Sequence, residues 1–167
     1  TQDSYTVQIT PRGLHLHLHR KNLFAWTENP VYRYRDFVLE ALIDFSDLKE
    51  DREAASAGTS AAGILFRLIS DSTFYSAQIS DRGFVRLDAV TNGTPIPILG
   101  WTETARNPER TDEDTAERSP YENSASVYSL RIIARDTSIT LIVNDTWVAQ
   151  CTDDTIQAAG KIAFAGQ

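Results

Sequence analysis

Short runs of alternating apolar and polar residues, separated by turn-forming residues, are the feature that most constrains the fold of this chain. The longest run spans residues 36–45, and its apolar residues Phe37, Leu39, Ala41, Ile43 and Phe45 fall on one face. Similar runs lie at 5–9, 13–19, 64–69, 74–80, 84–90, 95–101, 127–135, 138–144, 147–151 and 161–165. Because successive side chains of a strand point to opposite faces, this pattern predicts many short β-strands and no long amphipathic helix.

Turn residues between the runs predict how the strands are connected. Asn92-Gly93 is a strong signal for a two-residue hairpin turn, because both residues readily adopt positive φ. Residues 81–83 and the pair Asp136-Thr137 mark two further tight turns. Many strands with few helices predict an all-β fold, and specifically a two-sheet antiparallel jelly-roll sandwich.

The chain of 167 residues fits one domain, and no inter-domain linker interrupts it. We therefore expect a single β-sandwich domain over residues 1–167. Two segments break the strand pattern and are predicted to be long surface loops, at 47–61 and at 102–126.

Composition narrows the classes of partner. The net charge of −7 opposes binding to phosphate backbones, so we expect no nucleic-acid partner. No apolar run reaches the roughly 18 residues that a membrane span needs, so we expect no membrane insertion. No signal peptide is visible, and the absence of methionine indicates a chain that was processed or cut from a longer protein. Cys151 has no second cysteine to pair with and is predicted to be a half-buried strand thiol.

The order of motifs from Asp36 onward resembles a known superfamily. These motifs are Asp36-Phe37-x-Leu39-Glu40, Ala62-Gly63-Ile64-Leu65-Phe66-Arg67, Phe74-Tyr75, Gly83-Phe84-Val85-Arg86-Leu87, Gly100-Trp101-Thr102, Tyr128-Ser129-Leu130-Arg131-Ile132, Ile139-Thr140-Leu141-Ile142-Val143-Asn144 and Ala159-Gly160-Lys161-Ile162-Ala163-Phe164. Together they resemble the concanavalin A-like lectin/glucanase superfamily. Within it, they are similar to the 3-keto-disaccharide hydrolase group (formerly DUF1080) and related carbohydrate-binding modules. That group usually carries Asn-Gly where this chain has Asn144-Asp145, which predicts a different turn here.

This resemblance implies a jelly roll with one concave sheet that can hold sugar on its face or rim. We therefore expect a non-catalytic carbohydrate-binding domain of a larger, exported bacterial protein, located outside the cell, in the periplasm or at the cell surface. Its partner would be an oligosaccharide or polysaccharide, alongside other domains of the parent chain. Two alternatives remain open: a glycoside-cleaving enzyme of the 3-keto-disaccharide hydrolase type, and a structural or protein-interaction module.

Strand alternation predicts a polar row that could bind a sugar. If residues 81–83 form a tight turn, Gln78 lies opposite Arg86 in the hairpin. Pairing of 36–45 with 64–69 would add Glu40 and Arg67 to the same sheet face. Planar side chains of this kind form bidentate hydrogen bonds with hydroxyl groups. The alternative is a cross-strand Glu40–Arg67 ion pair on a solvated face.

Aromatic side chains would supply stacking surfaces for the C–H face of a sugar ring. Trp101 is the first candidate, and Tyr34, Trp26 and Phe74 are the others. The alternative is that the tryptophans are ordinary core or edge residues.

Three histidines, His15, His17 and His19, alternate along one predicted strand, so their rings would point to one side. Such histidines could ligate zinc with a further ligand from elsewhere, and the alternative is a polar strand face. Calcium is common in this superfamily, and carboxylate oxygens of Asp44, Asp153 and Asp154 could bind a calcium ion.

Carboxylates cluster at 50–53 and 112–114, within the two predicted loops. Glycosidases need two carboxyl groups on rigid elements, and the Glu-x-Asp-x-x-Glu motif of the superfamily's glucanases does not occur in this sequence. We therefore predict that these clusters are solvated surface and assign no catalytic residue.

Overall fold

The structure is a computed structural model that describes residues 4–20, 22–46, 60–104 and 127–167. The strands are β1 (Tyr5–Thr10), β2 (Gly13–Leu18), β3 (Ala25–Glu28), β4 (Phe37–Asp44), β5 (Ala61–Ser70), β6 (Thr73–Ser80), β7 (Phe84–Thr91), β8 (Thr94–Glu103), β9 (Val127–Arg135), β10 (Ser138–Val143), β11 (Thr146–Thr152) and β12 (Lys161–Gly166). No α-helix occurs among the described residues, and accordingly none there could cross a membrane.

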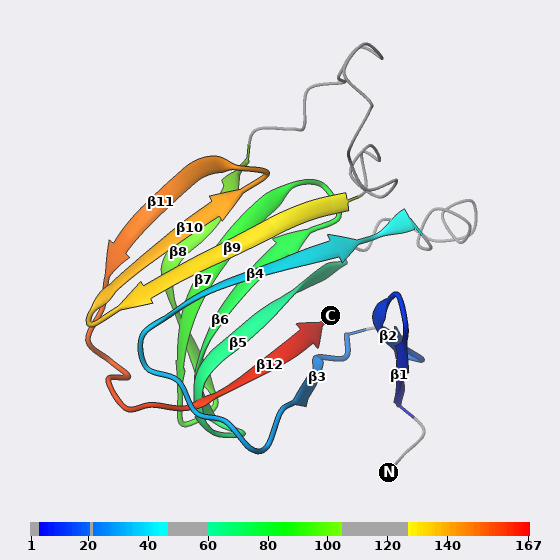
Figure 1. The fold of residues 1–167 in the computed structure, drawn as a ribbon, viewed down its shortest axis with the longest axis horizontal. Coiled ribbons are helices and arrows are strands. Elements are labelled where there is room, and N and C mark those ends of the chain that lie inside the picture. Colours follow the sequence, from blue (N-terminus) through cyan, green and yellow to red (C-terminus); the bar gives the residue numbers. More distant parts are fainter. Residues whose placement is uncertain (1–3, 21, 47–59, 105–126) are drawn as a thin grey trace.

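Two antiparallel sheets form the body of the domain. One has six strands in the order β3-β12-β5-β6-β7-β8, and the other has four in the order β11-β10-β9-β4. The four-stranded sheet lies over the six-stranded sheet, and the β1–β2 hairpin stands to one side, next to the end of β12 (Figure 1). This arrangement confirms the predicted all-β, two-sheet antiparallel sandwich.

The main core fills the space between the two sheets. The six-stranded sheet contributes Ile64, Phe66, Tyr75, Ala77, Ile79, Val85, Leu87 and Ala89, and the four-stranded sheet contributes Leu130, Ile132, Ala134, Ile139, Leu141 and Val143. The apolar side of β4, from Phe37 to Ile43, packs against this core, as its alternation predicts. Each fully buried large apolar side chain contributes about 1.5–3 kcal/mol, so this layer is the main source of stability.

A second apolar cluster lies on the outer face of the six-stranded sheet. Leu65, Phe74 and Val90 belong to it, and Phe24 and Trp26 pack against them. Outer-face residues of a sandwich usually face solvent. Here the side chains of Phe24, which precedes the edge strand β3, and of Trp26 on β3 cover part of that face.

Most predicted strands match the observed ones, with two differences. The strand β3 was not predicted, because Ala25–Glu28 is only four residues long. The loop predicted at 47–61 ends too late, because Ala61 already belongs to β5. The loop predicted at 102–126 begins too early, because β8 continues to Glu103. Residues 47–59 and 105–126, which include both acidic clusters, lie outside the described residues.

The β10–β11 turn corrects one expectation from the resemblance. Asn144 and Asp145 both have positive φ, at 50° and 58°. The Asn92-Gly93 turn between β7 and β8 has the same form, with φ of 51° and 76°. Positive φ at both central residues is the signature of the hairpin turn that Asn-Gly favours. The prediction that Asn144-Asp145 forms a different turn is therefore wrong, and Asp145 adopts a conformation that glycine adopts more easily.

Candidate functional site

The outer face of the six-stranded sheet carries a hollow of about 330 Å³. Strand register explains which side chains meet there. Gln78 pairs with Arg86 across β6 and β7, and the next outward-facing pair along the strands is Ser76 with Asp88. Trp101 stands on the neighbouring strand β8 and completes one wall. The predicted Gln78–Arg86 register is confirmed.

Arg86 is held by two contacts at once. Its Nε and Nη2 donate to the two carboxylate oxygens of Asp88 at 2.7 and 2.9 Å. Its guanidinium carbon lies 6.0 Å from the centre of the Trp101 ring. A bidentate pair and a cation–π contact both restrict the side chain, so Arg86 is preorganised on the sheet face. Its Nη1 donates to no residue that the structure describes and stays available to a ligand.

The floor of the hollow is polar and largely buried. Ser76 and Gln78 are 5% and 6% exposed, and the Asp88 side chain is 13% exposed. Gln78 Oε1 accepts a hydrogen bond of 2.9 Å from Gln167 Nε2, which fixes the amide. The Ser76 hydroxyl and Gln78 Nε2 have no hydrogen-bond partner within the described ranges. These groups are suited to binding hydroxyl groups that enter the hollow.

Aromatic rings form the opposite end of the hollow. Phe24 and Phe74 stack with ring centres 6.4 Å apart, and Trp26 lies 6.0 Å from Phe74. Phe24 and Phe74 line the hollow directly, and Trp101 stands across it, 41% exposed. The site therefore combines apolar ring faces with fixed polar groups.

Small residues leave the middle of this sheet face without bulky side chains. Ala165 of β12 and Gly63 of β5 continue the row from Gln78 toward β3. A Cβ atom on Gly63 would lie 2.0 Å from the Ala77 backbone oxygen and 2.7 Å from the Gln78 Cα. Only glycine therefore allows β5 and β6 to approach this closely, and the Gln78 backbone depends on it.

Arg67 is not part of the hollow, and its predicted place on the sheet face is wrong. The β5–β6 register shifts between Phe66 and Ser70, and Arg67 has a φ of 45°. This irregularity turns the side chain to the inner side of the sheet, where the guanidinium carbon lies 5.9 Å from the centre of the Tyr75 ring. Arg67 is completely buried, so it cannot bind a ligand at the surface.

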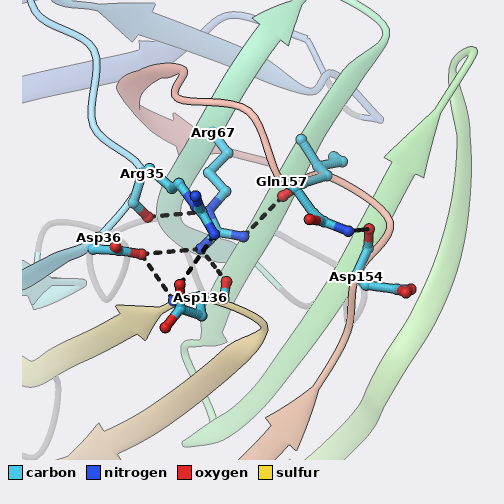
Figure 2. Close-up of polar contacts among 7 residues, drawn as sticks. Arg35, Asp36, Arg67, Asp136, Asp154 and Gln157 are labelled. Carbon is cyan, nitrogen blue, oxygen red and sulfur yellow. Dashed lines mark hydrogen bonds and ion pairs between the residues drawn. The ribbon is translucent and has the colours of Figure 1, made fainter.

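Backbone carbonyl oxygens satisfy the buried guanidinium (Figure 2). Arg67 donates to the carbonyl oxygens of Arg35 at 3.1 Å, Ile156 at 2.8 Å and Asp136 at 2.6 Å. The Asp36 carboxylate lies 3.8 Å away. Hydrogen bonds to carbonyl oxygens remove most of the cost of burying this charge. Arg67 thus joins three segments that are distant in sequence and has a structural role.

Glu40 lies on the other sheet, which contradicts both its predicted place in the binding row and the predicted Glu40–Arg67 pair. The strand β4 pairs with β9 and not with β5, so Glu40 faces Arg131. It accepts hydrogen bonds from the Ser129 hydroxyl at 2.7 Å and from Arg131 Nε at 2.8 Å. Hydrogen bonds from Ser129 and then from Arg131 lower the pKa of the Glu40 carboxyl below its ordinary value.

The predicted metal ligands do not form a metal site among the described residues. His15 and His17 lie side by side on the β1–β2 hairpin with ring centres 6.2 Å apart, while His19 Nε2 is hydrogen-bonded to the Thr6 hydroxyl. Asp44 binds the Ser46 backbone amide, and Asp153 binds the Tyr75 hydroxyl. Among the described residues, no group of three or more His, Cys, Asp or Glu side chains could hold a metal ion. The zinc and calcium hypotheses therefore have no support in this part of the chain.

Of the predicted ligand-binding residues, Gln78, Arg86 and Trp101 lie together, and Glu40 and Arg67 do not. Trp26 and Phe74 lie at the aromatic end, while Tyr34 pairs with Gly160 elsewhere. Sequence reasoning missed Phe24, Ser76, Asp88 and Gln167. Asp88 and Ser76 could have been found, because each lies two residues from Arg86 or Gln78 on the same strand face. Cys151 is half-buried on β11, as predicted.

The sequence is similar to part of a longer bacterial protein. A TPR repeat-containing protein of Treponema pallidum is 39% identical over an aligned length of 206 residues, and the alignment covers 99% of this chain. The chain spans only 23% of that relative. No protein-family model matches the sequence.

Solved structures with similar folds are more numerous. The carbohydrate-binding module CBM66 from Bacillus subtilis matches with a TM-score of 0.64 at 15% identity, covering 97% of this chain and 86% of that one. A β-glucanase from Bacillus licheniformis matches with a TM-score of 0.51 at 14% identity, covering 96% of this chain and 68% of that one. Sheep galectin-11 matches with a TM-score of 0.52 at 9% identity, covering 85% and 89% of the two chains.

The fold is the concanavalin A-like jelly roll. These similarities confirm the predicted jelly-roll sandwich fold. At such low identity they show the fold alone, because the same jelly roll carries unrelated functions. The function of this jelly roll therefore depends on the side chains that it carries.

Proposed function

We propose that this jelly roll binds carbohydrate, without cleaving it, in the hollow on the outer face of its six-stranded sheet. The observation that carries the proposal is the pairing of Trp101 with Arg86 above a floor of fixed polar groups. A sugar ring has an apolar C–H face and a rim of hydroxyl groups, so it needs both kinds of surface at once. The fold it shares with a carbohydrate-binding module also supports this function.

The charges of the hollow favour a neutral sugar. Arg86 and Asp88 neutralise one another and stand side by side, so one hydroxyl can donate to Asp88 while its neighbour accepts from Arg86. An anionic sugar would meet the Asp88 carboxylate and the negative charge of the whole chain. Adjacent hydroxyl groups of an uncharged sugar fit this arrangement best.

The cellular setting belongs to the same proposal. The chain aligns with less than a quarter of its Treponema pallidum relative, which supports a role as one module of a larger bacterial protein. Binding of an external glycan would place that parent protein outside the cell, in the periplasm or at the cell surface.

The test is a glycan array followed by calorimetric titration of the retained glycans. We expect Trp101→Ala to weaken binding at least tenfold, which corresponds to about 1.4 kcal/mol. The matched control is Trp147→Ala, because Trp147 is 63% exposed on β11 of the other sheet. No bound glycan, or equal losses in the two variants, would exclude this site. Release of reducing sugar from a bound glycan would show that the domain is an enzyme.

A further inference from the structure

A second hollow adjoins the first, on the far side of Trp101. Its volume is about 370 Å³, and it is lined by Ala61, Ser80, Arg82, Phe84, Trp101 and Gln167. Trp101 and Gln167 line both hollows. The two hollows are therefore neighbours on either side of these two side chains, and together they are called the groove below.

The register of β6 and β7 gives the direction of the groove. The first hollow lies over Phe74, Ser76 and Gln78, and the second lies over Ser80 at the end of β6. Ser80 lies six positions after Phe74, and a strand rises about 3.3 Å per residue, so the two hollows together follow the strands for about 20 Å. This length exceeds a single sugar ring.

Gln167 is fixed at the boundary between the hollows. Its backbone amide and carbonyl pair with Ala61 at 2.8 and 3.0 Å. Its side chain donates to Gln78 at 2.9 Å. These three hydrogen bonds hold Gln167 in place between the two hollows.

The second hollow has its own groups suited to a sugar. Phe84 is half-buried and offers an apolar ring, and the exposed Arg82 beside it offers five N–H donors. The Ser80 hydroxyl accepts from the Arg82 and Phe84 amides, at 3.3 and 3.1 Å, and so fixes the turn that carries both side chains. An aromatic ring with a nearby donor repeats the chemistry of the first hollow.

We propose that the groove binds a chain of at least two neutral sugar units, one in each hollow, on the two sides of Trp101. This inference rests on the proposed function, since it assigns a second subsite to the same carbohydrate-binding face. The first subsite is formed by Ser76, Gln78, Arg86 and Asp88. The second is formed by Arg82 and Phe84, which have no part in the first.

The experiment measures affinity against chain length by calorimetric titration. The probes are neutral gluco-, galacto-, manno- and fructo-oligosaccharides of one to four units. We expect the affinity of the best series to rise at least tenfold between one and two or more units. Phe84→Ala and Arg82→Ala should abolish most of this rise and leave the affinity for the single unit unchanged.

Control variants and distinct outcomes show whether the second subsite fails alone or carbohydrate binding fails altogether. Arg12→Ala, at an exposed arginine in the β1–β2 turn, is the control for Arg82→Ala, and melting curves check that Phe84→Ala folds. Equal affinity for one unit and for longer chains, or no effect of both substitutions, overturns the second subsite while carbohydrate binding stands. Failure of every probe to bind overturns the proposed function and this inference with it.

Discussion

Arg67 and Arg86 lie on opposite faces of the same sheet. Arg86 projects outward beside Trp101, whereas Arg67 projects inward over Tyr75. Strict alternation along β5 would have placed Arg67 outward, in line with Leu65. The irregular register after Phe66 reverses it, and the buried cation is stabilised by carbonyl oxygens from three distant segments.

We expect Arg67→Ala to lower the free energy of unfolding by more than about 3 kcal/mol, because three carbonyl oxygens would lose charged donors inside the protein. Arg67→Lys should lower the free energy of unfolding by less, since an ammonium group retains the charge but not the planar set of N–H donors. Urea unfolding at pH 7 measures both. Arg12→Ala, at an exposed position, should stay within about 0.5 kcal/mol of the wild type. An Arg67→Ala protein as stable as the wild type would contradict the structural role.

Tyr75 should make stability fall at high pH. Burial, and next the hydrogen bond to Asp153, raise the pKa of the Tyr75 hydroxyl from 10.0 to about 12. A raised folded-state pKa gives stability that is complete below pH 10 and is lost as the pH rises toward 12. Tyr75→Phe should cost about 1–3 kcal/mol at pH 7, since Asp153 loses a donor and the Ile156 amide loses its acceptor.

Unfolding curves of the wild type and Tyr75→Phe between pH 8 and about 12 check this expectation. The difference in stability between the two proteins should narrow above pH 10, where only the wild type must keep this phenol protonated. A difference that stays constant over the whole range would mean that the hydroxyl does not titrate as described.

Glu40 should contribute to the free energy of unfolding at neutral pH and lose this contribution at acidic pH. Its pKa is lowered from 4.5, first by the Ser129 hydroxyl and then by Arg131. Its stabilisation is therefore present above about pH 4.5 and is lost as the pH falls through the folded-state pKa. Because the side chain is 43% exposed, Glu40→Gln should cost no more than about 1 kcal/mol at pH 7. Chemical unfolding at pH 7 and pH 3 compares the two states, and an equal cost at both would reject the ion pair as its source.

The β10–β11 turn offers a stabilising substitution. Asp145 has a φ of 58°, where a Cβ atom costs about 1 kcal/mol and glycine avoids that cost. Asp145→Gly also removes an exposed ion pair of 3.1 Å with Arg131, which is worth little. We expect a net gain of up to about 1 kcal/mol by thermal unfolding. The matched comparison is Gly93→Asp in the Asn92-Gly93 turn, which should destabilise by a similar amount.

Arg86 and Asp88 should be strongly coupled. Removing either charge leaves the other partly buried without its partner, so Arg86→Gln and Asp88→Asn should each destabilise the domain. The double variant should cost less than the sum, with a coupling of about 0.5–3 kcal/mol in a urea-unfolding cycle. Additive costs would show that the pair does not act as a unit. Because the double variant leaves no unpaired charge, it also tests whether glycan binding needs this ion pair.

Local patterns predicted much of the fold and part of the candidate site. Alternation assigned Gln78 and Arg86 to one face, and the turn at 81–83 set their register, because both depend on residues close in sequence. Glu40 was misplaced because strands that follow one another in sequence were assumed to pair. In the structure β4 pairs with β9, with Glu40 opposite Arg131, a residue far along the chain.

The sequence by itself determined the all-β class, most strand positions and which side chains share a strand face, since these follow from the two-residue period of a strand and from turn chemistry. Only the tertiary structure decided which strands are neighbours and where the alternation breaks. Arg67 turns inward because carbonyl groups of Arg35, Asp136 and Ile156 meet around it, and these groups come together only when the two sheets pack. The groove likewise needs Trp101, Gln167 and Gln78 from three strands or segments, so its existence depends on packing that no local pattern encodes.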